Sequence, residues 1–140
     1  MLRAVMDTNV LVAGLRSRSG ASHELLRLLR EGRWVLALSN TVASEYHEVL
    51  HREAPALELT HAEVDKFLDA LCALAEQRSL TTEWQPAAID PDDEALVQLA
   101  REAGIAYLVS HNVRHVAAAE RFGVHVVRPA DFLTLLRQQL

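Results

Sequence analysis

Acidic residues stand at two places in this chain where they could bind a cation. Asp7 directly follows the short apolar run 4–6. A carboxylate that emerges from a buried strand is costly unless it is hydrogen-bonded, paired or bound to a metal. Asp90, Asp92 and Asp93 crowd the start of an expected helix. They repel one another and exceed what helix capping needs, and a hard cation such as Mg2+ or Mn2+ would relieve that repulsion.

Each candidate acid also has an ordinary structural interpretation. Asp7 begins an Asp-Thr-Asn sequence that is typical of turns and helix caps. Glu45 falls at the edge of an apolar helical stripe, where the macrodipole favours a glutamate near the helix N-terminus. Asp90 could be an N-cap before Pro91, with Asp93 folding back as a capping partner. From the residues alone, these alternatives stay open.

The elements that position these acids follow from the hydrophobic pattern. Apolar runs of strand length lie at 4–6, 34–38, 106–110 and 124–127, with a weaker extended segment at 80–84. Helical patterns with capping or stop signals lie at 22–31, 41–53, 60–75, 90–104, 116–122 and 130–137. Strands that alternate with helices predict an α/β fold, in which a central parallel sheet has helices on both faces.

Sites in such sheets lie beyond the carboxyl ends of the strands. Asp7, Ser39 and Ser110 each directly follow a predicted strand. We therefore expect these three residues at the same edge of the sheet, with the helix that carries Glu45 beginning beside them.

No other catalytic pattern in the sequence competes with these acids. The five glycines are scattered and form no phosphate-binding loop, and no Gly-x-Ser-x-Gly elbow is present. His47 and His51 have the spacing of zinc ligands on a helix, and the zincin signature has a glutamate right after its first histidine. Nothing completes such a site in the sequence, and we interpret both as surface histidines.

Composition bounds the kind of protein. With 140 residues, half of them apolar, the chain suits a single domain over 1–140 with one core. No stretch could span a bilayer and the N-terminus lacks the order of a signal peptide, so we expect no membrane contact and a cytoplasmic protein. The single cysteine, Cys72, excludes an intrachain disulfide. A net charge of −5 does not indicate a nucleic-acid binder, although a local arginine patch could still contact RNA.

Four segments in register resemble the PIN-domain family, in particular the toxin members of toxin–antitoxin systems, the VapC-like ribonucleases. The segment 5–12 is similar to the family's opening strand and its Asp-Thr-Asn signature. The segment 38–50 is similar to its second motif, with Glu45 at the functional glutamate, and 90–100 to its third, with Asp93. The segment 107–133 matches the closing pattern, so the resemblance runs the length of the chain.

The resemblance implies a three-layer, Rossmann-like PIN fold in which Asp7, Glu45 and Asp93 bind Mg2+ or Mn2+ at one edge of the sheet. It also implies an endoribonuclease. In such an enzyme the bound metal lowers the pKa of a water molecule and stabilises charge on the phosphate. An RNA substrate, a cognate antitoxin and a homodimer are the expected partners. Four further residues are expected close to the three acids: Asn9, Asp90, Ser110 and Asn112.

One position departs from the family pattern. Family members often carry an aspartate two residues after the Ser or Thr that ends the fourth motif's strand, and this chain has Asn112 there. Asparagine brings no charge and is a weaker metal ligand, which puts a second metal ion in doubt. The main alternative is therefore a PIN-fold binding or regulatory module with weakened catalysis. A haloacid-dehalogenase-like phosphatase is disfavoured because Asn9 occupies the place of its general acid.

The helix expected at 22–31 carries a broad leucine stripe. Four leucines lie close together on it, which is more apolar surface than one small core needs. We expect these residues to leave an apolar surface for a partner, while complete burial in the chain's own core is the alternative. The residues are Leu25, Leu26, Leu28 and Leu29.

Overall fold

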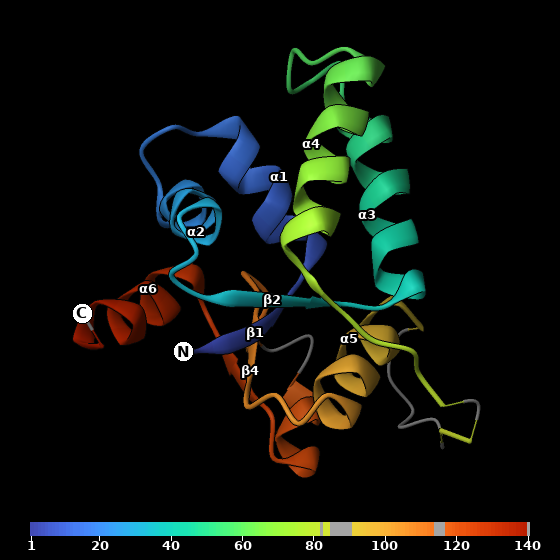
Figure 1. Ribbon diagram of the computed structural model, residues 1–140, viewed down its shortest axis with the longest axis vertical. Coiled ribbons are helices and arrows are strands. Elements are labelled where there is room, and N and C mark those ends of the chain that lie inside the picture. The colour runs from blue at the N-terminus through green and yellow to red at the C-terminus, as the bar shows by residue number, and fades with distance from the viewer. Residues whose placement is uncertain (82, 85–90, 114–116, 140) are drawn as a thin grey trace.

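The computed structural model describes residues 1–81, 83–84, 91–113 and 117–139. Within them, strands alternate with single helices or pairs of helices (Figure 1). The elements in chain order are β1 (Arg3–Met6), α1 (Thr8–Arg16), α2 (Ala21–Arg30), β2 (Val35–Leu38), α3 (Asn40–Glu53), α4 (His61–Leu74), β3 (Glu76–Gln77), α5 (Pro91–Glu102), β4 (Tyr107–Val109), the 3-10 helix η1 (Ala117–Phe122), β5 (His125–Val127) and α6 (Pro129–Gln138).

The described strands form one five-stranded sheet with the order β3-β2-β1-β4-β5. Each neighbouring pair is parallel, and the register pairs Met6 at the end of β1 with Val109 at the end of β4. The chain builds outward from β1 to β3 on one side and then returns to build β4 and β5 on the other. The direction of building therefore reverses between β1 and β4, which is where ligand sites form in open parallel sheets.

Helices cover both faces of this sheet. In Figure 1, α1 to α4 lie above the strands, and α5 and the 117–122 segment lie below them. α5 packs on β1, β2 and β4, while α6 packs against α2. The predicted α/β fold with a central parallel sheet and helices on both faces is confirmed. None of the described helices is long and apolar enough to cross a membrane.

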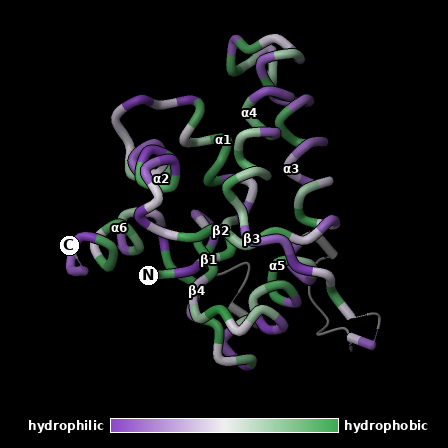
Figure 2. The backbone as a smooth tube through the Cα atoms, in the orientation of Figure 1, coloured by the Kyte–Doolittle hydropathy of each residue, from purple (hydrophilic) through white to green (hydrophobic). Residues whose placement is uncertain are grey.

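The inner strands β1, β2 and β4 are short, mainly apolar runs because both of their faces are covered. Ala4, Val5 and Met6 of β1 are completely buried, and Figure 2 shows hydrophobic residues concentrated along β1 and β2. Trp34, just before β2, is buried as well; its indole N–H donates to the carbonyl of Leu25, at 2.9 Å. This bond gives the polar end of a large core side chain a partner.

Helix α1 was not predicted from the sequence, where a turn or a helix cap was the ordinary structural interpretation of 7–9. Asp7 occupies the N-cap position of α1, but its side chain makes no capping hydrogen bond. Gly14 lets α1 approach α2 closely, since a Cβ atom at this position would lie 2.6 Å from Leu26 Cδ1 and 3.1 Å from the Ser22 carbonyl oxygen. The same glycine lowers the apparent helical propensity of the segment.

Two other elements differ from the prediction. The extended segment expected at 80–84 is not a strand at its described residues; β3 comes earlier, at Glu76–Gln77. It is a two-residue edge strand of polar side chains, which gives no apolar run to recognise. The short helix expected at 116–122 is a 3-10 helix at Ala117–Phe122.

The expectation that α2 leaves an apolar surface for a partner was wrong. The four leucines of its stripe lie in the core, at most 8% exposed. α1 and α6 both pack against α2, so the helix contributes to two interfaces, and a stripe wider than one interface needs is buried within the chain. The residues are Leu25, Leu26, Leu28 and Leu29.

Candidate active site

Asp7 lies at the carboxyl end of the central strand, where the sheet changes its direction of building. Its N–H continues the β1–β4 ladder by donating to the Val109 carbonyl, at 2.9 Å, and its own carbonyl accepts from Val10 N in the first turn of α1 at 3.0 Å. The backbone of Asp7 is thus held by both the sheet and the helix. Its carboxylate is directed by this backbone rather than by a capping bond.

Ser110 holds the Asp7 carboxylate from the end of β4. Its hydroxyl donates to Asp7 Oδ2 at 2.8 Å and accepts from the backbone N–H of Asn112 at 3.0 Å. Ser110 is fully buried, so the hydroxyl has both of its roles assigned inside the protein. The expectation that Asp7 and Ser110 share one edge of the sheet is confirmed.

Asn9 connects the start of α1 to the loop after β4. Its side-chain amide donates to Asp7 Oδ2 and to Ser110 Oγ, both at 3.4 Å, and its carbonyl oxygen accepts from His111 N at 3.3 Å. His111 Nε2 in turn contacts Ser22 Oγ of α2 at 3.1 Å. The ends of two neighbouring strands are therefore joined through neutral donors around one carboxylate.

Glu45 lies on α3, which begins at the end of β2, next to β1 in the sheet. Ser39 is the N-cap, and its hydroxyl accepts from Val42 N at 3.2 Å, as the sequence predicted for this helix start. The next residue after Glu45, Tyr46, is buried, and its hydroxyl donates to the Met6 carbonyl. Burial, and then the negative charge of Asp7, raise the pKa of the Tyr46 hydroxyl. This part of α3 therefore lies within electrostatic reach of Asp7.

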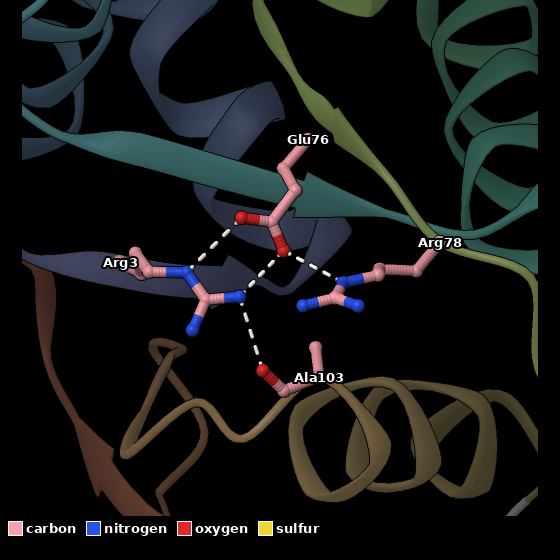
Figure 3. Close-up of polar contacts among 4 residues, drawn as sticks. All are labelled: Arg3, Glu76, Arg78 and Ala103. Atoms are coloured by element: carbon pink, nitrogen blue, oxygen red, sulfur yellow. Dashed lines mark hydrogen bonds and ion pairs between the residues drawn. The ribbon is translucent and has the colours of Figure 1, made fainter.

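Asp93 lies in the first turn of α5, and this carboxylate is only 5% exposed. The direction of α5 is fixed at its other end, where Arg3 Nη2 donates to the Ala103 carbonyl at 3.0 Å (Figure 3). Arg3 begins β1 and so marks the amino edge of the sheet. α5 packs on β1, β2 and β4, so we expect its N-terminal turn, at the end away from Arg3, to lie toward the carboxyl edge of the sheet.

The donor set at this edge suits a hard divalent cation. Carboxylate oxygens are the ligands that Mg2+ and Mn2+ take from proteins, commonly one or two of them together with water. Among the described residues, however, the three carboxylates of Asp7, Glu45 and Asp93 are not a group whose oxygens all lie within 4.8 Å of one another. Their convergence on one ion stays a prediction.

A groove opens next to Asn9 and His111. It has a volume of about 390 Å³ and lies between α1 and α3. Arg16 contributes a guanidinium to its wall, which is a suitable partner for a phosphate. The groove is lined by Asn9, Val12, Ala13, Arg16, Val49, Glu53 and His111.

For two of the residues expected close to the acids, the described part of the chain shows no side-chain contact with Asp7. Asn112 is an exposed residue, and its backbone N–H donates to the Ser110 hydroxyl oxygen. Asp90 lies outside the described residues. His111 is the addition that the structure makes to the predicted set. Its position directly after Ser110 was the only signal in the sequence.

Comparisons with known proteins agree with this architecture. A sequence model of the family described as "PIN domain" matches residues 3–114. Among solved structures, a chain of the crystal structure of VapBC2 from Rickettsia felis, bound to a DNA fragment from their promoter, is similar with a TM-score of 0.62. The identity is 14%, and the alignment covers 91% of this chain and 98% of that one. No curated protein matches the sequence.

Proposed function

The chain belongs to the PIN domain family, and on that premise we propose that it is a metal-dependent endoribonuclease. Asp7, Glu45 and Asp93 would hold Mg2+ or Mn2+, which supplies an activated water and neutralises charge on the phosphodiester. The observation that carries this proposal is the position of Asp7, a carboxylate at the reversal point of the sheet whose hydrogen-bond donors are neutral groups.

The residues around Asp7 serve to orient it. Ser110 and Asn9 both donate to Oδ2, and a carboxylate has several acceptor positions on its two oxygens. These bonds fix the plane of the group without neutralising its charge, because neither donor is ionised. A ligand held in one orientation loses less entropy when an ion binds.

The groove between α1 and α3 provides a path for the substrate. It begins at Asn9 and His111, next to the Asp7 carboxylate, and continues to Arg16 at the end of α1. A guanidinium in the wall of this groove can pair with a phosphate of an RNA strand. The proposal thus accommodates the net charge of −5, since the contact needs only a local positive group.

The toxin–antitoxin setting is part of the same proposal. It rests on the resemblance of the four sequence motifs, and the fold shared with the VapBC2 chain supports it. We propose that the protein acts in the cytoplasm, forms a homodimer and is inhibited by a small antitoxin protein. Co-expression with the neighbouring reading frame, followed by co-purification, tests this part separately from catalysis.

The decisive experiment is an RNA-cleavage assay with purified full-length protein. We expect cleavage with Mg2+ or Mn2+, loss of cleavage with EDTA, and recovery when excess metal is added. Glu45→Gln and Asp93→Asn should each abolish activity. Asp69→Asn is the matched control, because Asp69 is an exposed acid on α4 and should leave cleavage unchanged.

The assay also separates the proposal from its alternative. A folded protein that binds RNA or an antitoxin but cleaves no RNA with either metal would support the binding or regulatory module that Asn112 suggests. Cleavage that persists in EDTA, or in both acid variants, would overturn the metal site.

A further inference from the structure

A second cluster of potential metal ligands lies on the hairpin formed by α3 and α4, away from the carboxyl edge of the sheet where Asp7 lies. We propose that His47, His51 and Asp65 bind one zinc ion there. His47 and His51 stand four residues apart on α3, and Asp65 faces them from the first half of α4. Of the described residues, these form the one group of three or more histidines, cysteines or acids with ligand atoms all within 4.8 Å of one another.

The distances suit a tetrahedral ion. Asp65 Oδ1 lies 2.7 Å from His51 Nε2 and 3.7 Å from His47 Nε2. With metal–ligand bonds of about 2.0–2.1 Å, tetrahedral zinc separates its ligand atoms by about 3.4 Å. The two observed distances fall on either side of that value. Zinc would replace the hydrogen atom between His51 and Asp65, and the two ligand atoms would have to move apart by less than 1 Å. The Asp65 side chain has room for this movement, because it is 55% exposed.

His61 provides the support that a histidine ligand usually has. Its Nδ1 lies 2.7 Å from His51 Nδ1, on the side of the ring opposite to Asp65, and the two rings stack with centroids 4.9 Å apart. When a metal takes Nε2 of a histidine, the remaining N–H commonly donates to a neighbouring acceptor. With zinc on Nε2, the His51 Nδ1–H donates to His61 Nδ1, so one tautomer of each ring satisfies the whole arrangement.

The ligand types favour zinc over Mg2+ or Mn2+, the ions proposed for the site at Asp7. Two imidazoles and one carboxylate form a zinc donor set, whereas Mg2+ prefers oxygen and water. The segment 47–51 also reads His-Glu-Val-Leu-His, the pattern that places two histidines on one face of a helix for zinc.

The cluster is separate from the proposed active site. Glu45 precedes His47 by two residues, which is about 200° around the helix, so the two side chains leave α3 on different sides. The groove beside α3 is lined by Val49 and Glu53 rather than by the histidines. The ion would therefore bind α3 to α4, which lie side by side in Figure 1, and stabilise their packing. Water would complete its coordination.

Zinc binding is tested on the full-length chain with ZnCl2 as the only ligand. Because acids at the sheet edge could also take zinc, every protein in the experiment carries Asp7→Asn. We expect one zinc ion per chain by calorimetry and a rise in melting temperature of roughly 5 °C at saturation. Substitution by Co2+ should give the visible absorption of a tetrahedral site.

Variants assign the binding to these residues. Either His47→Gln or Asp65→Asn should remove the zinc-dependent rise in melting temperature, and His61→Phe should weaken affinity about tenfold. His125→Gln is the control, because His125 is an exposed histidine on β5 beside Glu120 and should change nothing.

The proposal is overturned if the Asp7→Asn protein binds no zinc, or if zinc binding survives His47→Gln and Asp65→Asn. In a chain with native Asp7, Asp65→Asn should keep its Mg2+-dependent cleavage. Zinc binding therefore stands or falls independently of the nuclease proposal.

Discussion

Two carboxylates of the same sheet are held in different ways. Glu76, on the edge strand β3, accepts hydrogen bonds from the guanidinium groups of Arg3 and Arg78 (Figure 3). Asp7, at the carboxyl end of the central strand β1, accepts from a hydroxyl and an amide. Cationic donors neutralise a carboxylate and bind the edge strand to the sheet, whereas neutral donors orient a carboxylate and keep its charge. The first arrangement serves stability, and the second suits the binding of a cation.

The electrostatic consequence is visible at Glu76. The hydrogen bond from Arg3, followed by that from Arg78, holds the pKa of the Glu76 carboxyl below its ordinary value of 4.5. The same residues connect three elements, because Arg3 on β1 also reaches the Ala103 carbonyl after α5. The short strand β3 is thereby attached to the sheet by side chains as well as by its backbone ladder.

The sharpest test of the comparison removes the negative charge of each carboxylate in turn. Asp7→Asn should reduce RNA cleavage by at least about a hundredfold while the fold persists, because removal of a ligand charge weakens metal binding and water activation. Glu76→Gln should leave cleavage unchanged. Single-turnover cleavage rates and far-UV circular dichroism of both variants decide the matter. Equal activity in the two variants would show that the two carboxylates do not differ in function.

The complementary test concerns stability. Arg3→Met should lower the free energy of unfolding by about 1 kcal/mol at pH 7, a modest value because both partners are partly exposed. Urea unfolding of the variant and the native chain measures this. Arg16→Met serves as the control for loss of an exposed arginine elsewhere, and a stability loss equal to that of Arg3→Met would contradict a specific role for the Arg3–Glu76 pair.

The pH dependence of that stability difference should follow the lowered pKa of Glu76. A carboxyl group with a folded-state pKa below its unfolded value stabilises the fold fully above the unfolded pKa, and the contribution disappears as pH falls through the folded one. The difference between the native chain and Arg3→Met should therefore be constant from pH 7 to about pH 5 and shrink below the ordinary value of 4.5. A difference that grows on acidification would refute the assignment.

The smallest expected effect concerns Asn112. Replacement by aspartate adds a negative charge at the end of β4, so Asn112→Asp should raise Mn2+ affinity a few-fold and lower the melting temperature of the metal-free protein slightly. Calorimetric titration with Mn2+ and thermal unfolding measure the two quantities. If neither changes, Asn112 serves only to shape the turn through its bond to Ser110.

The sequence predicted the parts of this molecule that depend on local patterns. Buried parallel strands are continuous apolar runs, so β1 and β2 were found, and capping patterns correctly began α3 and α4. The site residues Asp7 and Ser110 were placed at one edge because each directly follows a strand. Glu45 and Asp93 needed the resemblance to the family, because ordinary helix-end roles explained both equally well.

What the sequence could not predict depends on neighbours distant in the chain. The burial of the α2 leucines is decided by α1 and α6, and the short β3 is held by Arg3, which lies 73 residues away. The histidine pair at 47 and 51 was visible, but Asp65 and His61 join it only once α4 folds back on α3. In each of these cases, the missing information was a tertiary contact.

The central position of β1 has a consequence for how the protein is made. β1 is the first strand to be synthesised, but one of its two neighbours, β4, is among the last. The hydroxyl of Ser110 that holds Asp7 lies 103 residues further along the chain. At about 5–20 residues per second, a growing chain carries Asp7 for several seconds or longer before its partner leaves the ribosome. The contact between Ser110 and Asp7 can therefore form only after both strands of the pair, β1 and β4, have left the ribosome.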